Sequence, residues 1–201
     1  MADRTLLREL FESWVERGEH LAKEQWSAPT RLGDWTVTDL YAHMAADRTA
    51  FRKLLATRSD KPPVATTGAD VLRALNIPGG PAETLAPTVA ERARAEAAAH
   101  TPADLLDNMR AMLADGFEYI DIADGTIDYV IGPVTISAVL EVAVVEATVH
   151  LLDLIAAVGG DPAPPAAVAR ACEIVLAVPD PLPLLEAATG RSTTSPFPVL
   201  R

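Results

Sequence analysis

Apolar residues recur at helical spacing in four long stretches of the chain, separated by segments rich in proline and glycine. In residues 3–24, leucine and aromatic side chains return every three or four positions with charged residues between them, which is typical of an amphipathic helix. Similar patterns predict a second helix from Thr36 to about Thr57, a third over about 88–120 that restarts at 101–104, and a fourth over 134–158. Four long helices joined by shorter connections favour an antiparallel four-helix bundle.

Capping residues mark several of these boundaries. Thr36 is followed three positions later by Asp39, and Thr101 by Asp104. In each pair the threonine is expected to cap the helix, and the aspartate to return a hydrogen bond from the third helical position. Gly159 follows the last apolar residue of the fourth helix and is expected to end it.

The connecting segments are less regular. Residues 58–87 contain several prolines and glycines and are expected to form a long loop around a short helix at 70–75. Residues 124–133 are expected to connect the third and fourth helices, with room for a short extended piece. Two short helices, at about 165–178 and 181–188, precede a proline-rich tail.

Composition agrees with a helical chain of one domain. Hydrophobic residues make up 49% of the 201 residues, but aromatic residues only 5%. That profile suits packed helices better than a sheet sandwich, and the length permits one sizeable core. We therefore expect an all-α domain, with the bundle in residues 1–160 and a short helical and proline-rich extension of the same domain in residues 161–201.

Charge and targeting signals narrow the possible partners and compartment. The formal net charge is −11, which disfavours nucleic acid and anionic membrane surfaces. The start of the chain lacks the apolar core of a signal peptide, and ionisable residues interrupt the apolar stretch at 134–158. Cys172 is the single cysteine, which excludes an internal disulfide; it lies among apolar residues, where a buried, inert thiol is expected. These features favour a cytoplasmic protein. No feature decides whether it forms a homodimer.

Three ionisable residues interrupt the most apolar helix, in the sequence VVEATVHLLDL. Glu146 and His150 are four residues apart and share one helical face, and Asp153 lies three residues further on the same side. Asp153 is therefore placed to accept a hydrogen bond from one ring nitrogen of His150, which leaves the other ring nitrogen to bind a metal ion. His43 on the second helix would complete a three-ligand metal site inside a bundle. The alternative to a metal site is that Glu146 and His150 form only a surface contact on their helix, and that the lone histidine of the second helix is a hydrogen-bonded core residue.

The segment PTRLGDWTVTDLYAHMAAD, residues 29–47, resembles the signature of the mycothiol-dependent maleylpyruvate isomerase family, whose N-terminal domain belongs to the DinB-like helical superfamily. The matching residues of this signature are Trp35, Thr36, Val37, Asp39, Leu40 and His43, whereas Asp34 stands where glycine is usual. VVEATVHLLDL is similar to the family's second motif, Glu-x-x-x-His-x-x-Asp, and the ending LLEAATGRSTTSPFPVLR is similar to the end of many members.

The resemblance implies a DinB-like bundle with a divalent metal held by His43, Glu146 and His150. Zinc is the expected metal, with nickel as the alternative. Three protein ligands leave a position open for water or a thiol, as in catalytic zinc sites. In the family that position is thought to receive the thiol of mycothiol, which would then react with a small electrophilic substrate. The expected partners are accordingly a low-molecular-weight thiol and a small molecule.

The sequence also departs from the family. Maleylpyruvate isomerases proper carry an α/β domain after the bundle, whereas only a short segment rich in Ala and Pro follows the fourth helix here, so we expect a substrate other than maleylpyruvate. The expected activity is a metal-dependent thiol transferase or isomerase. The alternative is a non-catalytic bundle that binds a small molecule or a protein, with a structural or lost metal site. Asp47 lies one turn after His43. It either lines the pocket, where it would bind substrate or assist proton transfer, or pairs in solvent with Arg48 or Lys53.

Overall fold

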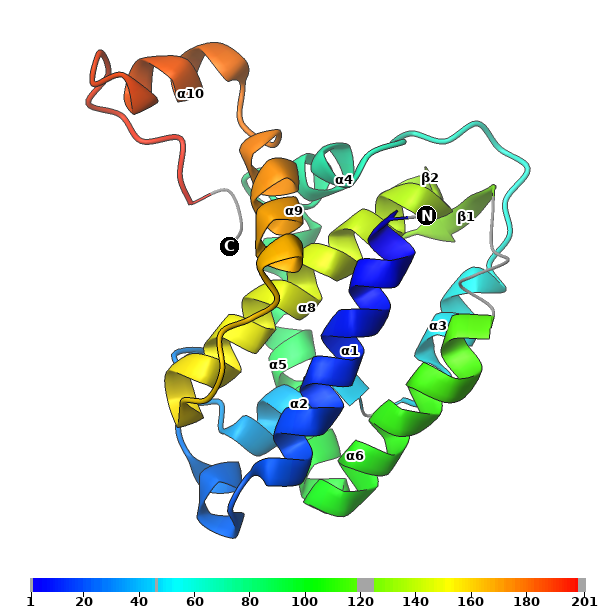
Figure 1. The fold of residues 1–201 in the computed structure, drawn as a ribbon. Helices are drawn as coiled ribbons and strands as arrows, with labels where there is room; N and C mark the ends of the chain where they lie inside the picture. The colour runs from blue at the N-terminus through cyan, green and yellow to red at the C-terminus, as the bar shows by residue number, and fades with distance from the viewer. Residues whose placement is uncertain (1, 46, 119–124, 199–201) are drawn as a thin grey trace.

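The computed structural model describes residues 2–45, 47–118 and 125–198, and within them the chain is mostly helical. Helices α1, α2, α4 and α9 pack on α8, which runs through the middle of the molecule (Figure 1). In chain order the elements are α1 Ala2–His20, a 3-10 turn Lys23–Ser27, α2 Val37–Ala45, α3 Ala50–Leu55, α4 Gly68–Leu75, α5 Pro81–Ala99, α6 Pro102–Ala111 with a π-helical continuation Met112–Gly116, β1 Thr126–Tyr129, β2 Gly132–Thr135, α8 Ile136–Val158, α9 Pro165–Leu176 and α10 Pro181–Ala188.

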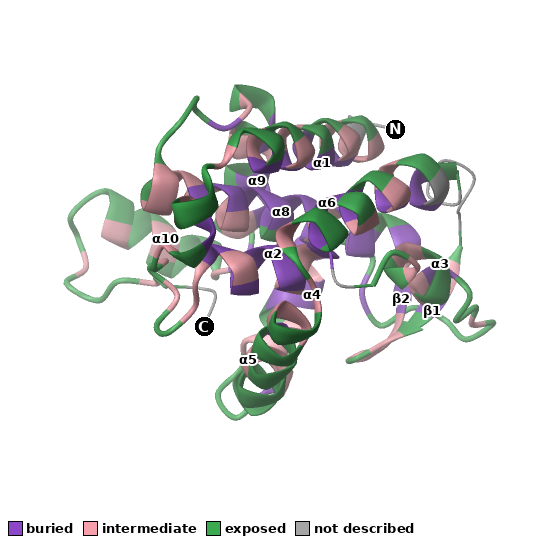
Figure 2. Ribbon diagram, turned by 90° about the horizontal axis from the view of Figure 1, so that it is seen from below, coloured by how far each residue is buried: buried purple, intermediate pink, exposed green. Residues whose placement is uncertain are grey.

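The core forms where α1, α4 and α9 pack on α8, and where α2 packs against α5, α6 and α8. Figure 2 shows α8 largely buried and α5 largely exposed. The apolar face of α1 contributes Leu7, Leu10 and Trp14, all with 0% exposure. The expected all-α character is thus confirmed as a mostly helical fold. The specific DinB-like arrangement of four helices stays a prediction, as does the division of the domain at residue 160.

Trp14 joins the two helices that carry the candidate ligands. Its indole Nε1 donates a hydrogen bond of 3.2 Å to the carbonyl oxygen of Ala147 on α8. Its own carbonyl oxygen accepts a hydrogen bond of 3.0 Å from the hydroxyl of Tyr41 on α2. The two aromatic rings also meet edge to face, with centroids 5.0 Å apart. Because Ala147 and Tyr41 lie close in sequence to Glu146 and His43, Trp14 fixes α2 relative to α8 near the candidate site.

The expected caps are present. Asp39 accepts hydrogen bonds from the backbone and the hydroxyl of Thr36. Thr101 and Asp104 form a reciprocal capping box at the start of α6. Gly159 ends α8 with a φ of 77°, a conformation that favours glycine.

Three boundaries differ from expectation. The predicted second helix is two helices, because the carboxylate of Asp47 accepts hydrogen bonds from the backbone and hydroxyl of Thr49 and so stabilises a turn between α2 and α3. Helix α5 begins at Pro81 rather than near residue 88, because a proline is well suited to the first turn, where its missing N–H costs nothing. The first helix ends at His20, before the 3-10 turn. The predicted end of the third helix near Ile120 lies outside the described residues.

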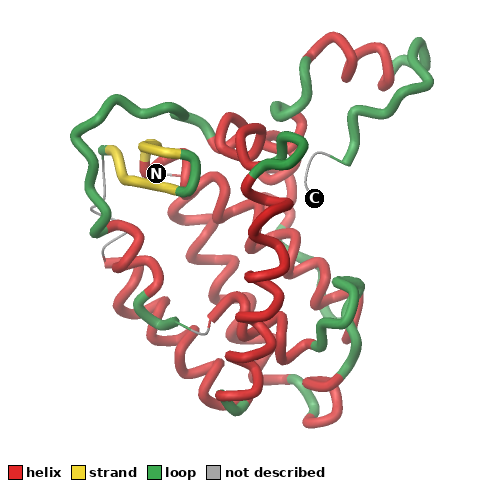
Figure 3. Tube along the Cα trace, turned by 180° about the vertical axis from the view of Figure 1, so that it is seen from behind, coloured by secondary structure: helices red, strands yellow, loops and turns green. Residues whose placement is uncertain are grey.

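The connection between α6 and α8 holds the only strands in the described residues. β1 and β2 pair antiparallel, with Ile127 opposite Val134, and form the small hairpin in Figure 3. Both of these side chains have 0% exposure, so the hairpin packs its apolar face on the helices. It places Tyr129 beside the first half of α8.

The C-terminal helices are present as expected. Helix α9 presents Ala167, Ala171 and Ile174 to the core. Cys172, one position after Ala171, points away from that face and is exposed, so the expectation of a buried thiol is wrong. Helix α10 buries no residue and stands apart from the other helices in Figures 1 and 3. Within the described ranges, no helix combines the length and apolar character needed to cross a lipid bilayer.

Candidate metal centre

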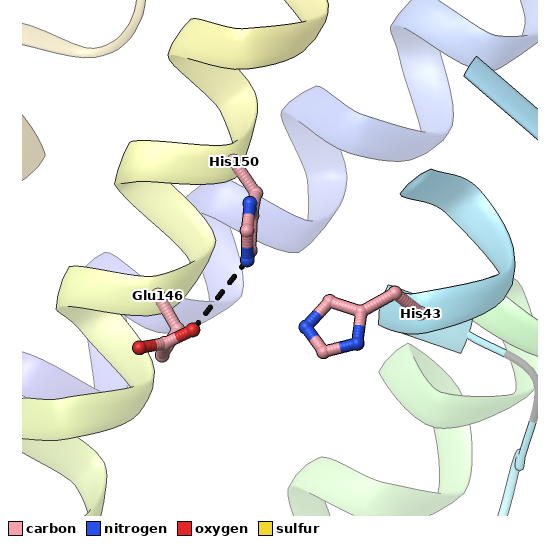
Figure 4. Close-up of side chains that lie close together, drawn as sticks. All are labelled: His43, Glu146 and His150. Atoms are coloured by element: carbon pink, nitrogen blue, oxygen red, sulfur yellow. Dashed lines mark ion pairs between the residues drawn. The ribbon is translucent and has the colours of Figure 1, made fainter. Parts of the chain in front are cut away.

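The structure brings together three side chains from helices that lie a hundred residues apart in the sequence. One ligand atom from each of His43, Glu146 and His150 lies within 4.8 Å of the other two. His43 comes from α2, and the other two come from successive turns of α8 (Figure 4). All three can bind a divalent cation, and an N₂O donor set of this kind is common in catalytic zinc sites.

Glu146 and His150 already interact without a metal. His150 Nε2 lies 3.5 Å from a carboxylate oxygen of Glu146, the contact drawn as a dashed line in Figure 4. Burial acts to raise the pKa of the Glu146 carboxyl, but the hydrogen bond and charge of His150 outweigh burial and hold this pKa below its usual value. Glu146 is therefore ionised at neutral pH, as a metal ligand must be.

His150 is held from its other side by Asp153. The carboxylate Oδ2 of Asp153 lies 3.0 Å from His150 Nδ1, as expected from their spacing. Burial acts to lower the pKa of His150, but the hydrogen bonds to Asp153 and Glu146 outweigh it and raise the pKa to about 9. The Asp153 side chain is 3% exposed, so the carboxylate is well placed to fix the orientation of the ring.

Arg31 extends this chain of contacts to the loop before α2. Its Nε donates a hydrogen bond of 2.5 Å to Oδ1 of Asp153, so each oxygen of the carboxylate has its own donor. No sequence signal pairs these two residues, because they lie 122 positions apart. The sequence indicates only that Arg31 is a cationic residue in the segment before Trp35.

His43 differs from His150 in its surroundings. Its ring stacks at an angle against Trp35, with centroids 5.3 Å apart, and meets His150 edge to face at 5.0 Å. Burial and the neighbouring charge of His150 lower the pKa of His43 to about 4, so its imidazole is neutral at pH 7. Its Nδ1 is buried and has no hydrogen-bond partner in the described part of the chain. A neutral, incompletely satisfied imidazole beside a carboxylate fits a metal ligand.

An apolar cavity of about 230 Å³ adjoins two of the three candidate ligands. His43 and Glu146 form part of its wall, together with Tyr129 from the hairpin. The other described residues of the wall are apolar and come from several helices, among them Phe11, Met44, Phe51, Met112 and Leu140. A bound metal would thus lie beside an apolar pocket, which is the usual form of a small-molecule site, and the 48% exposure of the Glu146 side chain leaves the metal site open to solvent on one side.

Other polar residues lie outside this cavity. Asp47 forms a 2.7 Å ion pair with Lys53, and 45% of its side chain is exposed. Of the two roles expected from the sequence, a pocket residue or an ion-pair partner in solvent, Asp47 therefore has the second. A larger cavity of about 440 Å³ lies at the C-terminal end of α8 and contains none of the three candidate ligands. There the guanidinium of Arg17 donates hydrogen bonds to the carbonyl oxygens of Asp161 and Pro162.

The chain was compared with protein families, curated proteins and solved structures. No curated protein and no solved structure matched it. The family model of the mycothiol maleylpyruvate isomerase N-terminal domain matches residues 7–155, which include all three candidate ligands and Asp153. This match covers well over half of the chain and agrees with the resemblance in its two motifs. The chain therefore belongs to the mycothiol maleylpyruvate isomerase N-terminal domain family.

Proposed function

We propose that this protein is a divalent-metal-dependent enzyme that acts on a small electrophilic substrate with the help of a small thiol, mycothiol. It either transfers the thiol to the substrate or uses the thiol to isomerise the substrate. His43, Glu146 and His150 would hold the metal, with zinc favoured over nickel. The observation that carries the proposal is the convergence of these three side chains, whose ligand atoms lie within 4.8 Å of one another, beside an apolar cavity that His43 and Glu146 help to line. Family membership supports the choice of thiol.

Each part of the site has a role in such a reaction. A divalent metal supplies charge that lowers the pKa of a bound thiol, so that a thiolate is available at neutral pH. Asp153 orients His150, and Arg31 holds Asp153 in place. The cavity binds the electrophile next to the ligands and keeps water away from it.

Metal content tests the ligand assignment. Protein purified without chelator or nickel resin is expected to contain nearly one zinc per chain by elemental analysis. The variants His43→Ala and His150→Ala are expected to lose it. His20→Ala is the matched control, because His20 lies at the exposed end of α1, where its ring forms a hydrogen bond with the backbone carbonyl of Glu16. Metal-free wild-type protein of unchanged stability would overturn the assignment.

A rate measurement separates the enzyme from a non-catalytic binding protein. Metal-loaded protein is expected to accelerate the reaction of mycothiol with a bimane electrophile relative to metal-free protein. A zinc-loaded protein with no acceleration would favour the alternative, a helical binding protein with a structural metal.

A further inference from the structure

The cavity beside the candidate ligands has an unusual balance of polar and apolar groups. Of the fifteen described residues that line it, only His43, Glu146 and Tyr129 carry a polar side chain. The first two are assigned to the metal, so among the described lining residues Tyr129 is the one whose polar group is left for a ligand. The cavity therefore offers a substrate many apolar contacts and few hydrogen bonds.

The charge of the wall disfavours an anion. None of the lining residues that the structure describes is an arginine or a lysine. A carboxylate that entered the apolar part would lose its hydration without gaining an arginine or lysine partner from the described wall. An uncharged ligand does not meet this cost.

The volume sets the size of that ligand. An apolar cavity of about 150 Å³ is large enough to bind benzene. The cavity here, at about 230 Å³, has room for a substituted aromatic ring or an aliphatic group of similar size.

Tyr129 is positioned to recognise a polar group on such a ligand. It ends strand β1, and its hydroxyl makes no hydrogen bond with any other residue that the structure describes. Burial, reinforced by the negative charge of Glu146, raises the pKa of the Tyr129 hydroxyl above its usual value. The hydroxyl thus keeps its proton at neutral pH and is available as a donor.

We propose that this cavity binds the apolar body of an uncharged electrophile, such as an aromatic or aliphatic carbonyl compound, and that the Tyr129 hydroxyl donates a hydrogen bond to its carbonyl oxygen. That the ligand is an electrophile rests on the proposed function. Its lack of charge, its size and its contact with Tyr129 follow from the cavity itself.

Binding to metal-free protein tests the proposal without depending on metal or thiol. Benzalacetone and cinnamate have nearly the same shape, but one ends in a methyl ketone and the other in a carboxylate. In calorimetric titrations of chelator-treated protein, benzalacetone is expected to bind at least tenfold more tightly than cinnamate. Equal or tighter binding of cinnamate would overturn the proposal.

Two variants locate the binding site. Ala143→Met places a larger side chain in the cavity wall and is expected to weaken benzalacetone binding at least tenfold. Ala156→Met is the matched control, because Ala156 is an exposed residue of the same helix outside the cavity. Equal affinities of the two variants would show that the ligand binds elsewhere.

The role of Tyr129 has its own comparison. Tyr129→Phe is expected to weaken benzalacetone binding by about three- to tenfold, the usual effect of one hydrogen bond. Binding of propenylbenzene, which lacks the carbonyl group, is expected to be unchanged. Equal effects on the two ligands would mean that Tyr129 acts through packing alone, contrary to the proposal. If the ligand binds as expected but no zinc is found, the proposed function fails and this inference stands.

Discussion

Replacing Asp153 with asparagine tests whether this carboxylate supports the metal site. In the structure the two oxygens of Asp153 accept hydrogen bonds from two different donors, His150 and Arg31. Asparagine has the same shape but only one acceptor oxygen, so one of the two contacts would place two donors opposite each other. Asp153→Asn should therefore preserve the fold while weakening the orientation of His150.

The expected size follows from similar contacts behind metal-bound histidines. Loss of such a partner typically lowers metal affinity by about 10- to 100-fold, or about 1.4 to 2.8 kcal/mol. Zinc affinity can be measured by competition with a chromophoric chelator at fixed pH. Asp47→Asn provides the control, because Asp47 follows His43 by four residues in the sequence but pairs with Lys53 in solvent. Equal zinc affinities for the two variants would refute the reasoning that Asp153 acts on the metal through His150.

Three further predictions concern pH and stability. Because the pKa of His150 is raised from 6.5 to about 9, its ion pairs stabilise the metal-free protein fully below pH 6.5, and this contribution is lost as the pH rises through about 9. Zinc binding at pH 7.5 should therefore release about one proton from His150. Calorimetry in buffers of different ionisation enthalpy measures this number, and a value of zero would contradict the prediction. In urea titrations of metal-free protein, Leu10→Ala should lower the free energy of unfolding by about 2 to 5 kcal/mol, because Leu10 is fully buried. Leu182→Ala is the control: its side chain is 65% exposed, so the free energy of unfolding should change by less than about 0.5 kcal/mol. Thr101→Ala removes the cap of α6 and should cost about 0.5 to 2 kcal/mol, with Thr101→Ser close to wild type in thermal melts.

The parts of the structure that the sequence predicts well are those fixed by neighbouring residues. Glu146, His150 and Asp153 lie on one helix, so their spacing alone places them together. The caps at Thr36 and Thr101 likewise depend on a residue three positions away. That His43 joins them is one of two interpretations that the spacing leaves open, and the resemblance to the family motif favours it.

The parts that the sequence does not predict depend on competition or on distant contacts. Asp47 and Thr49 stabilise a turn within a segment whose apolar pattern continues as a helix, and the pattern gives no measure of that competition. The Arg31–Asp153 contact joins two residues that only the complete fold brings together. The apolar stretch around Cys172 is helical as expected, but the spacing of the core contacts turns this one side chain to solvent.

The central position of α8 has a consequence for the order of folding. The helices before it, α1 and α4, pack on α8, as does α9 after it. While the chain is being synthesised, the apolar face of α1 therefore has no complete partner until residues 136–158 have left the ribosome. Contacts between segments so distant in the chain form slowly, and exposed apolar faces favour aggregation in the interval. We expect fragments that stop before α8 to require a chaperone to remain soluble, although they contain all of α1 to α6.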